Sequence, residues 1–234
     1  MSGPPYLSRL RIARNPQVAA LAQLLNPEHA GRRMDAHHRL LWSAFSGDAD
    51  APRDFLWRDE GRGNFLVLSA RPPVASPFFE EADTRPFAPE LQVGDRLAFL
   101  LRANATRTED TGLLSAGGKP RKRHIDLVMD ALRTTPQGKR APVRMEAAQR
   151  AATDWLTLQG EQHGFQLKDV SVHDYSVRAL PSRGGPRKDQ PQLGVLELSG
   201  HLTVTDPMAF VSQLERGFGR AKAFGCGLML IRRS

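Results

Sequence analysis

The amino-acid sequence predicts an α+β protein made of two successive halves, each with an antiparallel sheet covered on one face by helices. Segments of alternating apolar and polar residues, typical of half-buried strands, are interspersed with segments whose apolar residues recur at helical spacing. Their order is β-α-β-β-loop-β over residues 1–110 and α-β-β-α-β over residues 143–234. This order is close to two tandem ferredoxin-like domains, and 234 residues are enough for both.

The first half is predicted to begin with a strand at residues 6–14 and a short helix at 18–25, followed by an amphipathic helix at 34–45. At 100° per residue, this longer helix has one apolar face, with His37 near its middle and His38 at its edge. Asp35 is a candidate N-cap. Both histidines would then lie in the first turn, where the positive end of the helix dipole favours a phosphate.

The rest of the first half is predicted to consist of strands. Residues 55–57 and 64–70 are mostly apolar and flank a turn at 59–63, so they predict a hairpin. Residues 72–89 are rich in proline and acidic residues and predict irregular chain. Residues 96–104 predict an apolar strand that closes this half.

Residues 111–142 are predicted to be a basic linker or insertion between the halves. They contain two adjacent glycines, Pro120 and Pro136, and a basic cluster at 119–123. A short helix is predicted at 125–132. A solvated linker and a contact with RNA or a protein partner are both compatible with this composition.

The second half is predicted to contain two helices and three strands. Asp206 followed by Pro207 is a strong helix start, because aspartate caps the helix and proline fits its first turn. The predicted elements are a helix at 143–158, strands at 165–177 and 193–204 joined by a basic hairpin loop at 178–190, the helix that starts at 206, and a last strand at 227–231.

The excess positive charge is confined to the later part of the chain. The formal net charge is +8, whereas residues 1–110 hold 14 arginines, no lysine and 14 acidic residues. A basic half-molecule indicates a polyanionic partner, most commonly nucleic acid, and a solvated basic face is the alternative.

The single cysteine, Cys226, excludes an internal disulfide and fits a reducing, cytoplasmic compartment. It lies between two glycines beside an apolar strand, which predicts a small packed residue rather than a nucleophile. No membrane span or signal peptide is predicted. The histidines and the cysteine show no metal-ligand spacing, so neither a metal nor a cofactor is expected. Acidic residues such as Asp59 are expected at turns and on the surface.

A glycine-rich stretch near the C-terminus is the strongest local motif. Gly217, Gly219, Gly225 and Gly227 surround a basic patch of Arg216, Arg220 and Lys222. Glycines allow a backbone to turn tightly and to approach a phosphate, although a plain helix-to-strand connection is an alternative. The order helix–loop–strand excludes a dinucleotide-binding fingerprint, and no Gly-Lys-Ser/Thr sequence indicates a P-loop.

Several motifs occur together in a fixed order. They are the opening strand YLSRLRIAR, the His38-x-x-x-Trp42 spacing, Arg102-Ala103-Asn104, the basic pair Lys139-Arg140, the G-x-L-x-V strand at 200–204 and the loop G-x-G-R-A-K-x-x-G-x-G-L at 217–228. Over nearly its whole length the chain thereby resembles the CasE family of CRISPR-associated RAMP endoribonucleases from type I-E systems. The RAN sequence and the terminal loop are the most specific pieces.

The resemblance implies two RAMP/RRM-like ferredoxin-like domains and metal-independent cleavage of repeat hairpins in CRISPR precursor RNA. It also implies that the protein keeps the mature crRNA and works with other subunits of the Cascade complex. His38 takes the position of the catalytic histidine, with His37 in reserve, and histidine suits proton transfer near neutral pH. Family members carry a tyrosine three residues before this histidine. Here the residue is Asp35, so the resemblance leaves the second acid–base group unassigned.

Candidate RNA-binding residues are basic side chains near these motifs, and hairpin RNA is recognised mainly through its shape, phosphates and 2′-hydroxyls. They are Arg39, Arg102, Arg178, Arg183, Arg187, Lys188, Arg220 and Lys222. Arg102 is equally compatible with a structural ion pair at a strand edge. Two other functions remain open: a non-catalytic RNA-binding or assembly subunit of the same architecture, and a basic ferredoxin-like protein that binds another RNA such as tRNA or rRNA.

Overall fold

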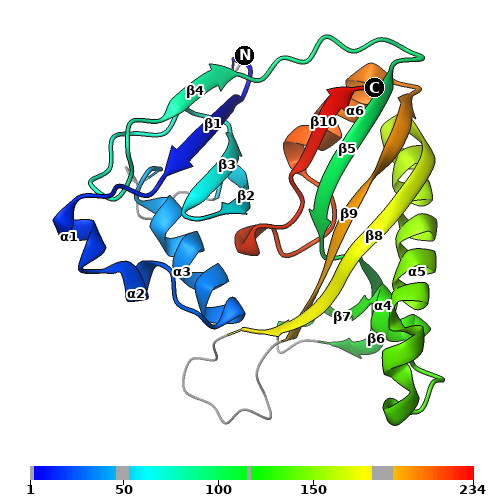
Figure 1. Ribbon diagram of the computed structural model, residues 1–234. Helices are drawn as coiled ribbons and strands as arrows, with labels where there is room; N and C mark the ends of the chain where they lie inside the picture. The colour runs from blue at the N-terminus through cyan, green and yellow to red at the C-terminus, as the bar shows by residue number, and fades with distance from the viewer. Residues whose placement is uncertain (1–2, 46–52, 115–116, 181–191) are drawn as a thin grey trace.

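The computed structural model describes residues 3–45, 53–114, 117–180 and 192–234. These residues form two four-stranded antiparallel sheets, with strand orders β2-β3-β1-β4 and β10-β5-β9-β8, and one two-stranded sheet, β6-β7. The two larger sheets lie in separate halves of the molecule, and α5 runs along the second (Figure 1). The prediction of an α+β protein with antiparallel sheets and helices packed on them is confirmed.

The first sheet buries its apolar residues beneath α3. The elements of this half are β1 (Tyr6–Arg11), α1 (Pro16–Ala19), α2 (Ala22–Leu25), α3 (Ala30–Trp42), β2 (Phe55–Gly61), β3 (Asn64–Ser69) and β4 (Asp83–Pro86). Alternate residues of β2 and β3, such as Phe55, Trp57 and Phe65, pack with Leu40 and Leu41 of α3 in one core. The aromatic residues that predicted the hairpin are therefore the residues that hold α3 on the sheet.

The second half completes a β-α-β-β-α-β order. Its elements are β5 (Arg96–Ala103), α5 (Arg140–His163), β8 (Phe165–Ala179), β9 (Gln192–Val204), α6 (Pro207–Arg216), the 3₁₀ turn η3 (Lys222–Phe224) and β10 (Met229–Arg233). The helix start predicted at Asp206 is confirmed, because its carboxylate accepts a hydrogen bond from the backbone N–H of Ala209 at 3.0 Å. The described residues contain no helix with the length and apolar character needed to cross a membrane.

The placement of the strand at residues 96–104 in the first half is wrong. This strand, β5, pairs with β9 and β10 and supplies the first strand of the second sheet. The first sheet instead uses β4, which lies in the stretch predicted to be irregular. β4 is a short, mostly exposed edge strand ending in a proline, so it has no apolar alternation to reveal it. β5 buries Leu97, Phe99 and Leu101 in the core that includes α5 and α6.

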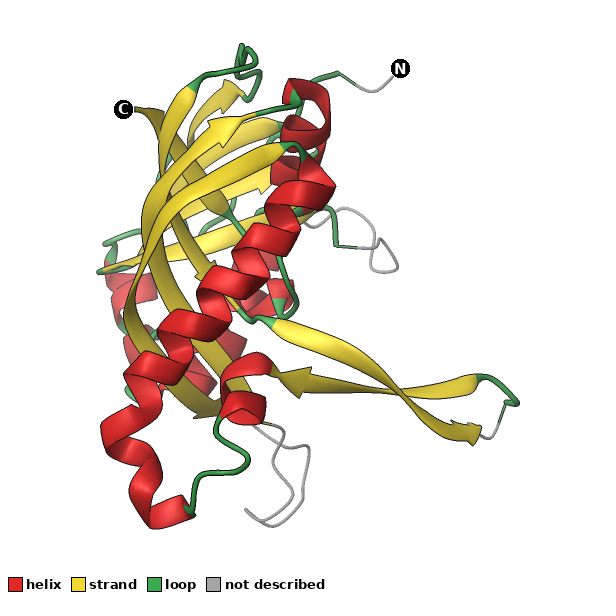
Figure 2. Ribbon diagram, turned by 90° about the vertical axis from the view of Figure 1, so that its right-hand side faces the viewer, coloured by secondary structure: helices red, strands yellow, loops and turns green. Residues whose placement is uncertain are grey.

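Residues 111–142, predicted to be a linker, contain ordered elements. β6 (Thr106–Leu114) and β7 (Pro120–Asp126) pair as an antiparallel hairpin that extends away from the body as an arm (Figure 2). The chain continues through α4 (Leu127–Ala131) and η1 (Gln137–Lys139) into α5. Strands β6 and β7 were not predicted because the arm has exposed residues on both faces over most of its length. It therefore lacks the apolar–polar alternation typical of a half-buried strand.

The predicted start of the histidine-bearing helix is also wrong. α3 begins at Ala30 with His29 as its N-cap residue, so His37 and His38 lie about two turns inside the helix. Asp35 does not cap the helix. Its carboxylate pairs with Arg39 one turn later, at 2.7 Å. The dipole of the first turn therefore does not act on the histidines, since this effect falls off within one turn.

The two halves are joined through apolar packing, an ion pair and one backbone approach. Leu56 and Leu68 of the first sheet pack with Leu228 just before β10, and Arg58 pairs with Glu197 of β9 at 3.1 Å. Near the start of α3, a Cβ built on Gly31 would lie 1.9 Å from the carbonyl oxygen of Ala179, the last residue of β8. The close approach of α3 to the second half therefore requires glycine at position 31.

We expect Gly31→Ala to lower the free energy of unfolding by about 1–3 kcal/mol, because the added methyl group pushes α3 away from Ala179. Glycine to alanine in a helix is otherwise stabilising. Gly138→Ala is the matched control, since nothing lies within 4 Å of a Cβ there. Thermal and urea denaturation of both variants measure the effect. A Gly31→Ala variant as stable as wild type would show that the approach is not constrained.

Candidate active site

His38 lies where α3 meets the glycine-rich loop. Its ring centroid is 6.4 Å from that of Phe55 on β2 and 6.3 Å from that of Phe224 in η3. The indole N–H of Trp42 donates to Nε2 of His38 at 3.3 Å, which explains the His38-x-x-x-Trp42 spacing as a contact across one helical turn. The ring is half-buried, and its Nδ1 has no hydrogen-bond partner among the described residues.

The glycine-rich loop is fixed against the first half by Trp57. The indole N–H of Trp57 donates to the carbonyl oxygen of Ala223 at 3.3 Å. Gly225 has φ 76°, and a Cβ there would lie 3.1 Å from the Trp57 ring. Gly217, Gly219 and Gly227 also have positive φ, so the four glycines serve the turns and the close packing of this loop. A direct role of the glycines in approaching a phosphate stays a prediction.

Lys222 and Cys226 occupy different environments within this loop. The ammonium group of Lys222 donates to the carbonyl oxygen of Arg216 at 2.6 Å, and partial burial together with the charge of Arg53 lowers its pKa. Cys226 is fully buried, and burial raises the pKa of its thiol to about 12. The prediction that Cys226 is a packed residue is confirmed, because a thiol in this state is not a nucleophile near neutral pH.

The pKa of His38 is lowered from its ordinary value, chiefly because burial disfavours the imidazolium. The positive charge of Arg53 lowers it further, Asp35 acts in the opposite direction, and Arg39 adds a smaller lowering effect. His38 is therefore mostly neutral at pH 7 in the free protein.

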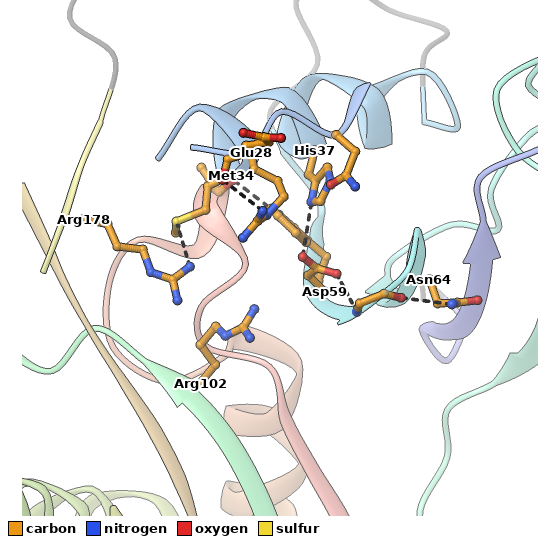
Figure 3. Close-up of polar contacts among 12 residues, drawn as sticks. Glu28, Met34, His37, Asp59, Asn64, Arg102 and Arg178 are labelled. Atoms are coloured by element: carbon orange, nitrogen blue, oxygen red, sulfur yellow. Dashed lines mark hydrogen bonds and ion pairs between the residues drawn. The ribbon is translucent and has the colours of Figure 1, made fainter. Parts of the chain in front are cut away.

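His37 has a structural environment. It is 2% exposed, its Nδ1 lies 3.5 Å from a carboxylate oxygen of Asp59, and its Nε2 lies 3.3 Å from the side-chain oxygen of Asn26. Figure 3 shows the His37 side chain directed at Asp59. The expectation that Asp59 is a surface turn residue is therefore wrong, because it is the partner of a buried histidine. Both ring nitrogens of His37 are occupied, which leaves neither free for a substrate.

The contact with His37 changes the pKa of the Asp59 carboxylate. Burial favours its protonated form, but the hydrogen bonds from His37 and from the backbone N–H of Gly61 outweigh burial and lower its pKa below 3.8. A lowered pKa in the folded state stabilises the fold above pH 3.8, and this stabilisation is lost as the pH falls through the lowered value.

The predicted RNA-binding residues fall into different places. Arg39 is exposed on α3 and pairs with Asp35. Arg102 pairs with Glu197, which also accepts from Arg58. The structure therefore shows the structural ion pair that was the alternative to RNA binding for Arg102. Arg178 lies at the end of β8 with its guanidinium 3.6 Å from the sulfur of Met34 on α3 (Figure 3).

Arg220 is exposed just before η3, and its backbone N–H donates to the carbonyl oxygen of Asn104 at 3.1 Å. This contact joins the RAN sequence to the glycine-rich loop and explains why the two motifs occur together. Arg183, Arg187 and Lys188 lie outside the described residues. The structure thus brings His38 against the glycine-rich loop, which carries Lys222, and it also places Arg178 against α3.

Sequence reasoning missed Arg53, which stands two residues before Phe55 at the start of β2. Its guanidinium is close enough to lower the pKa of both His38 and Lys222. The available signal was its position, because side chains two apart along an extended chain share a face and Phe55 is an apolar residue of the predicted hairpin. Without knowing which helix covers that face, the sequence did not connect Arg53 with His38.

Comparison with known proteins agrees with this arrangement. The family described as "CRISPR associated protein" matches residues 5–233. The CRISPR system Cascade subunit CasE of Escherichia coli (strain K12) is 31% identical over 199 residues, covering 82% of this chain and 88% of that protein. The CRISPR-associated endoribonuclease Cse3 of Thermus thermophilus is 27% identical over 231 residues, covering 89% and 96%. A solved structure of CRISPR endoribonuclease Cse3 bound to 19 nt RNA matches with a TM-score of 0.64 at 25% identity, covering 97% and 99%.

The extent of these matches shows the family. The chain belongs to the CRISPR-associated CasE/Cse3 (Cas6e) family of type I-E systems. The resemblance found in the sequence is confirmed.

The two histidines differ in what they do for the fold, and their variants test this. We expect His37→Ala to lower the free energy of unfolding by about 2–3 kcal/mol, because it creates a cavity and leaves the half-buried Asp59 carboxylate without its partner. His38→Ala removes a half-exposed ring and one long hydrogen bond, so its cost is below about 1 kcal/mol. Urea denaturation measures both values, and equal losses would contradict the assignment of His37 to structure.

Proposed function

We propose that this protein is a metal-independent endoribonuclease that cleaves repeat hairpins of CRISPR precursor RNA and remains bound to the mature crRNA as a Cascade subunit. The observation that carries the proposal is the position of His38. It is half-buried, mostly neutral at pH 7 and packed against Phe224 of the glycine-rich loop, in a chain that belongs to the CasE/Cse3 family. The printed names of the relatives, a Cascade subunit and an endoribonuclease, support the two parts of the proposal.

The reaction uses a nucleophile that RNA itself supplies. The 2′-hydroxyl oxygen attacks the adjacent phosphorus, a bond from phosphorus to the 2′-oxygen forms, and the bond to the 5′-oxygen breaks. The 2′-hydroxyl loses a proton and the departing 5′-oxygen gains one, which leaves a 2′,3′-cyclic phosphate and a 5′-hydroxyl. His38 exchanges a proton with one of these oxygens. Lys222 offsets negative charge on the phosphorane.

A non-catalytic RNA-binding or assembly subunit is the second candidate. The observation that favours it is Asp35, which stands three residues before His38 and is already engaged with Arg39. A carboxylate in an ion pair does not donate a proton near neutral pH. Tight repeat binding without cleavage would support this candidate.

Cleavage of the host's own repeat RNA in EDTA tests the proposal. We expect His38→Ala to lower the single-turnover rate by about 100- to 10,000-fold, the usual contribution of acid–base catalysis, with repeat binding retained. His201→Ala is the matched control, because this exposed histidine pairs with Asp169 on the second sheet, away from α3. A His38→Ala enzyme that cleaves like wild type would refute the site, and a wild type that binds without cleaving would favour the assembly subunit.

Binding is expected to depend steeply on salt, because contacts with phosphates release counterions. We expect Arg220→Ala to weaken repeat binding and to flatten the slope of log affinity against log salt by about one unit. Arg150→Ala on α5 is the control, since this arginine is exposed and pairs with Glu146. Filter binding between about 50 and 200 mM salt measures the slopes, and equal slopes for Arg220→Ala and wild type would remove Arg220 from the interface.

A further inference from the structure

Arg53 lies on the face of the first sheet that α3 covers. It precedes Phe55 by two residues, and side chains two apart along an extended chain point to the same face. The Phe55 ring packs in the core beneath α3 and lies 6.4 Å from the His38 ring. The guanidinium of Arg53 is therefore directed toward the end of the sheet at which His38 lies.

Arg53 differs from other half-buried arginines because no carboxylate pairs with it in the described part of the chain. Arg58 and Arg102 share Glu197, and Arg71 pairs with Asp54 at 2.9 Å. The Nη1 of Arg53 is shielded from solvent and donates to no acceptor among the described residues; the Nη1 of Arg58 is in the same state, but Glu197 neutralises the Arg58 charge. Leaving such a donor unpaired costs about 1–3 kcal/mol, and more for a charged group, so Arg53 is expected to meet an acceptor from outside the described residues.

A second unpaired donor lies beside Arg53. Because Nε2 of His38 accepts from Trp42, the neutral ring carries its proton on Nδ1, and this buried atom also has no described partner. Lys222 approaches from η3, within the influence of the Arg53 charge. Around His38 stand Asp35 and Arg39 on α3, Arg53 before β2 and Lys222 on η3. Asp35, the acidic member of this group, is engaged by Arg39 at 2.7 Å.

From this geometry we infer that Arg53 and Lys222, together with the Nδ1–H of His38, form an anion site for the phosphate at which RNA is cleaved. The inference deepens the proposed function and rests on it. A guanidinium presents two parallel N–H donors that match two oxygens of one phosphodiester, whereas the lysine acts as a single charge. The anion supplies the acceptors that Arg53 and His38 lack among the described residues.

The site also couples substrate binding to proton transfer. In the free protein the charge of Arg53 opposes protonation of His38. A phosphate bound between Arg53 and His38 offsets that charge and favours the imidazolium. The pKa of His38 therefore rises when an anion binds, which moves its proton transfer closer to working pH.

The test follows the His38 ring by NMR while pH is varied, in sodium phosphate and in sodium chloride of equal ionic strength. In wild type we expect the pKa of His38 to be higher in phosphate than in chloride. In Arg53→Gln the pKa should be raised already in chloride and should no longer respond to phosphate. Arg150→Gln is the control, because this exposed arginine pairs with Glu146 on α5 and the response of His38 to phosphate should remain. An Arg53→Gln protein that titrates and responds like wild type would overturn the inference.

A kinetic measurement completes the test. We expect Arg53→Gln to lower the single-turnover cleavage rate of repeat RNA by about 100-fold or more, with affinity changed less than about tenfold, because the lost interaction acts on charge that develops during reaction. Arg53→Lys, which keeps the charge, should recover part of the rate. Equal rates for Arg53→Gln and wild type would exclude the site from cleavage. If wild type fails to cleave, the proposed function fails, and the titration still decides whether the anion site exists.

Discussion

The candidate site depends on the packing of α3 and the glycine-rich loop against the same end of the first sheet. Trp57 bonds to Ala223 and fills the space that Gly225 leaves, while Gly31 allows the start of α3 to touch the end of β8. These contacts join segments far apart in the chain and place His38 next to η3. A side chain added at either glycine acts on the geometry of the site through the packing of the two halves.

Charge is distributed so that carboxylates neutralise the basic groups of the interior and leave the site positive. Glu197 forms ion pairs with Arg58 and Arg102 where the halves meet, and Asp59 pairs with the buried His37. Arg53 has no carboxylate partner in the described ranges, so it lowers the pKa of its neighbours His38 and Lys222. The charges of Arg58 and Arg102 are paired, so the unpaired charge of Arg53 indicates where an external anion is expected to bind.

Elements with strong local signals were predicted well from the sequence, and those without them were not. The helix at Asp206-Pro207 and the hairpin of β2 and β3 follow from capping chemistry and aromatic alternation, and both are present. β4 and the β6–β7 arm were missed because an edge strand and an exposed arm need no regular apolar face. The start of α3 was misplaced because Asp35 resembles a cap but pairs with Arg39 instead.

By itself, the sequence determined the fold class, the family and the catalytic candidate His38, because motif order, the Trp42 spacing and the glycine pattern are local properties of the chain. Only the tertiary structure decided that β5 belongs to the second sheet, that His37 is held by Asp59 and Asn26, and that Arg53 lies beside His38. These outcomes depend on which distant segments share a face or a core. No local pattern specifies such contacts, since they follow from how the apolar faces and the charges of the whole chain are satisfied together.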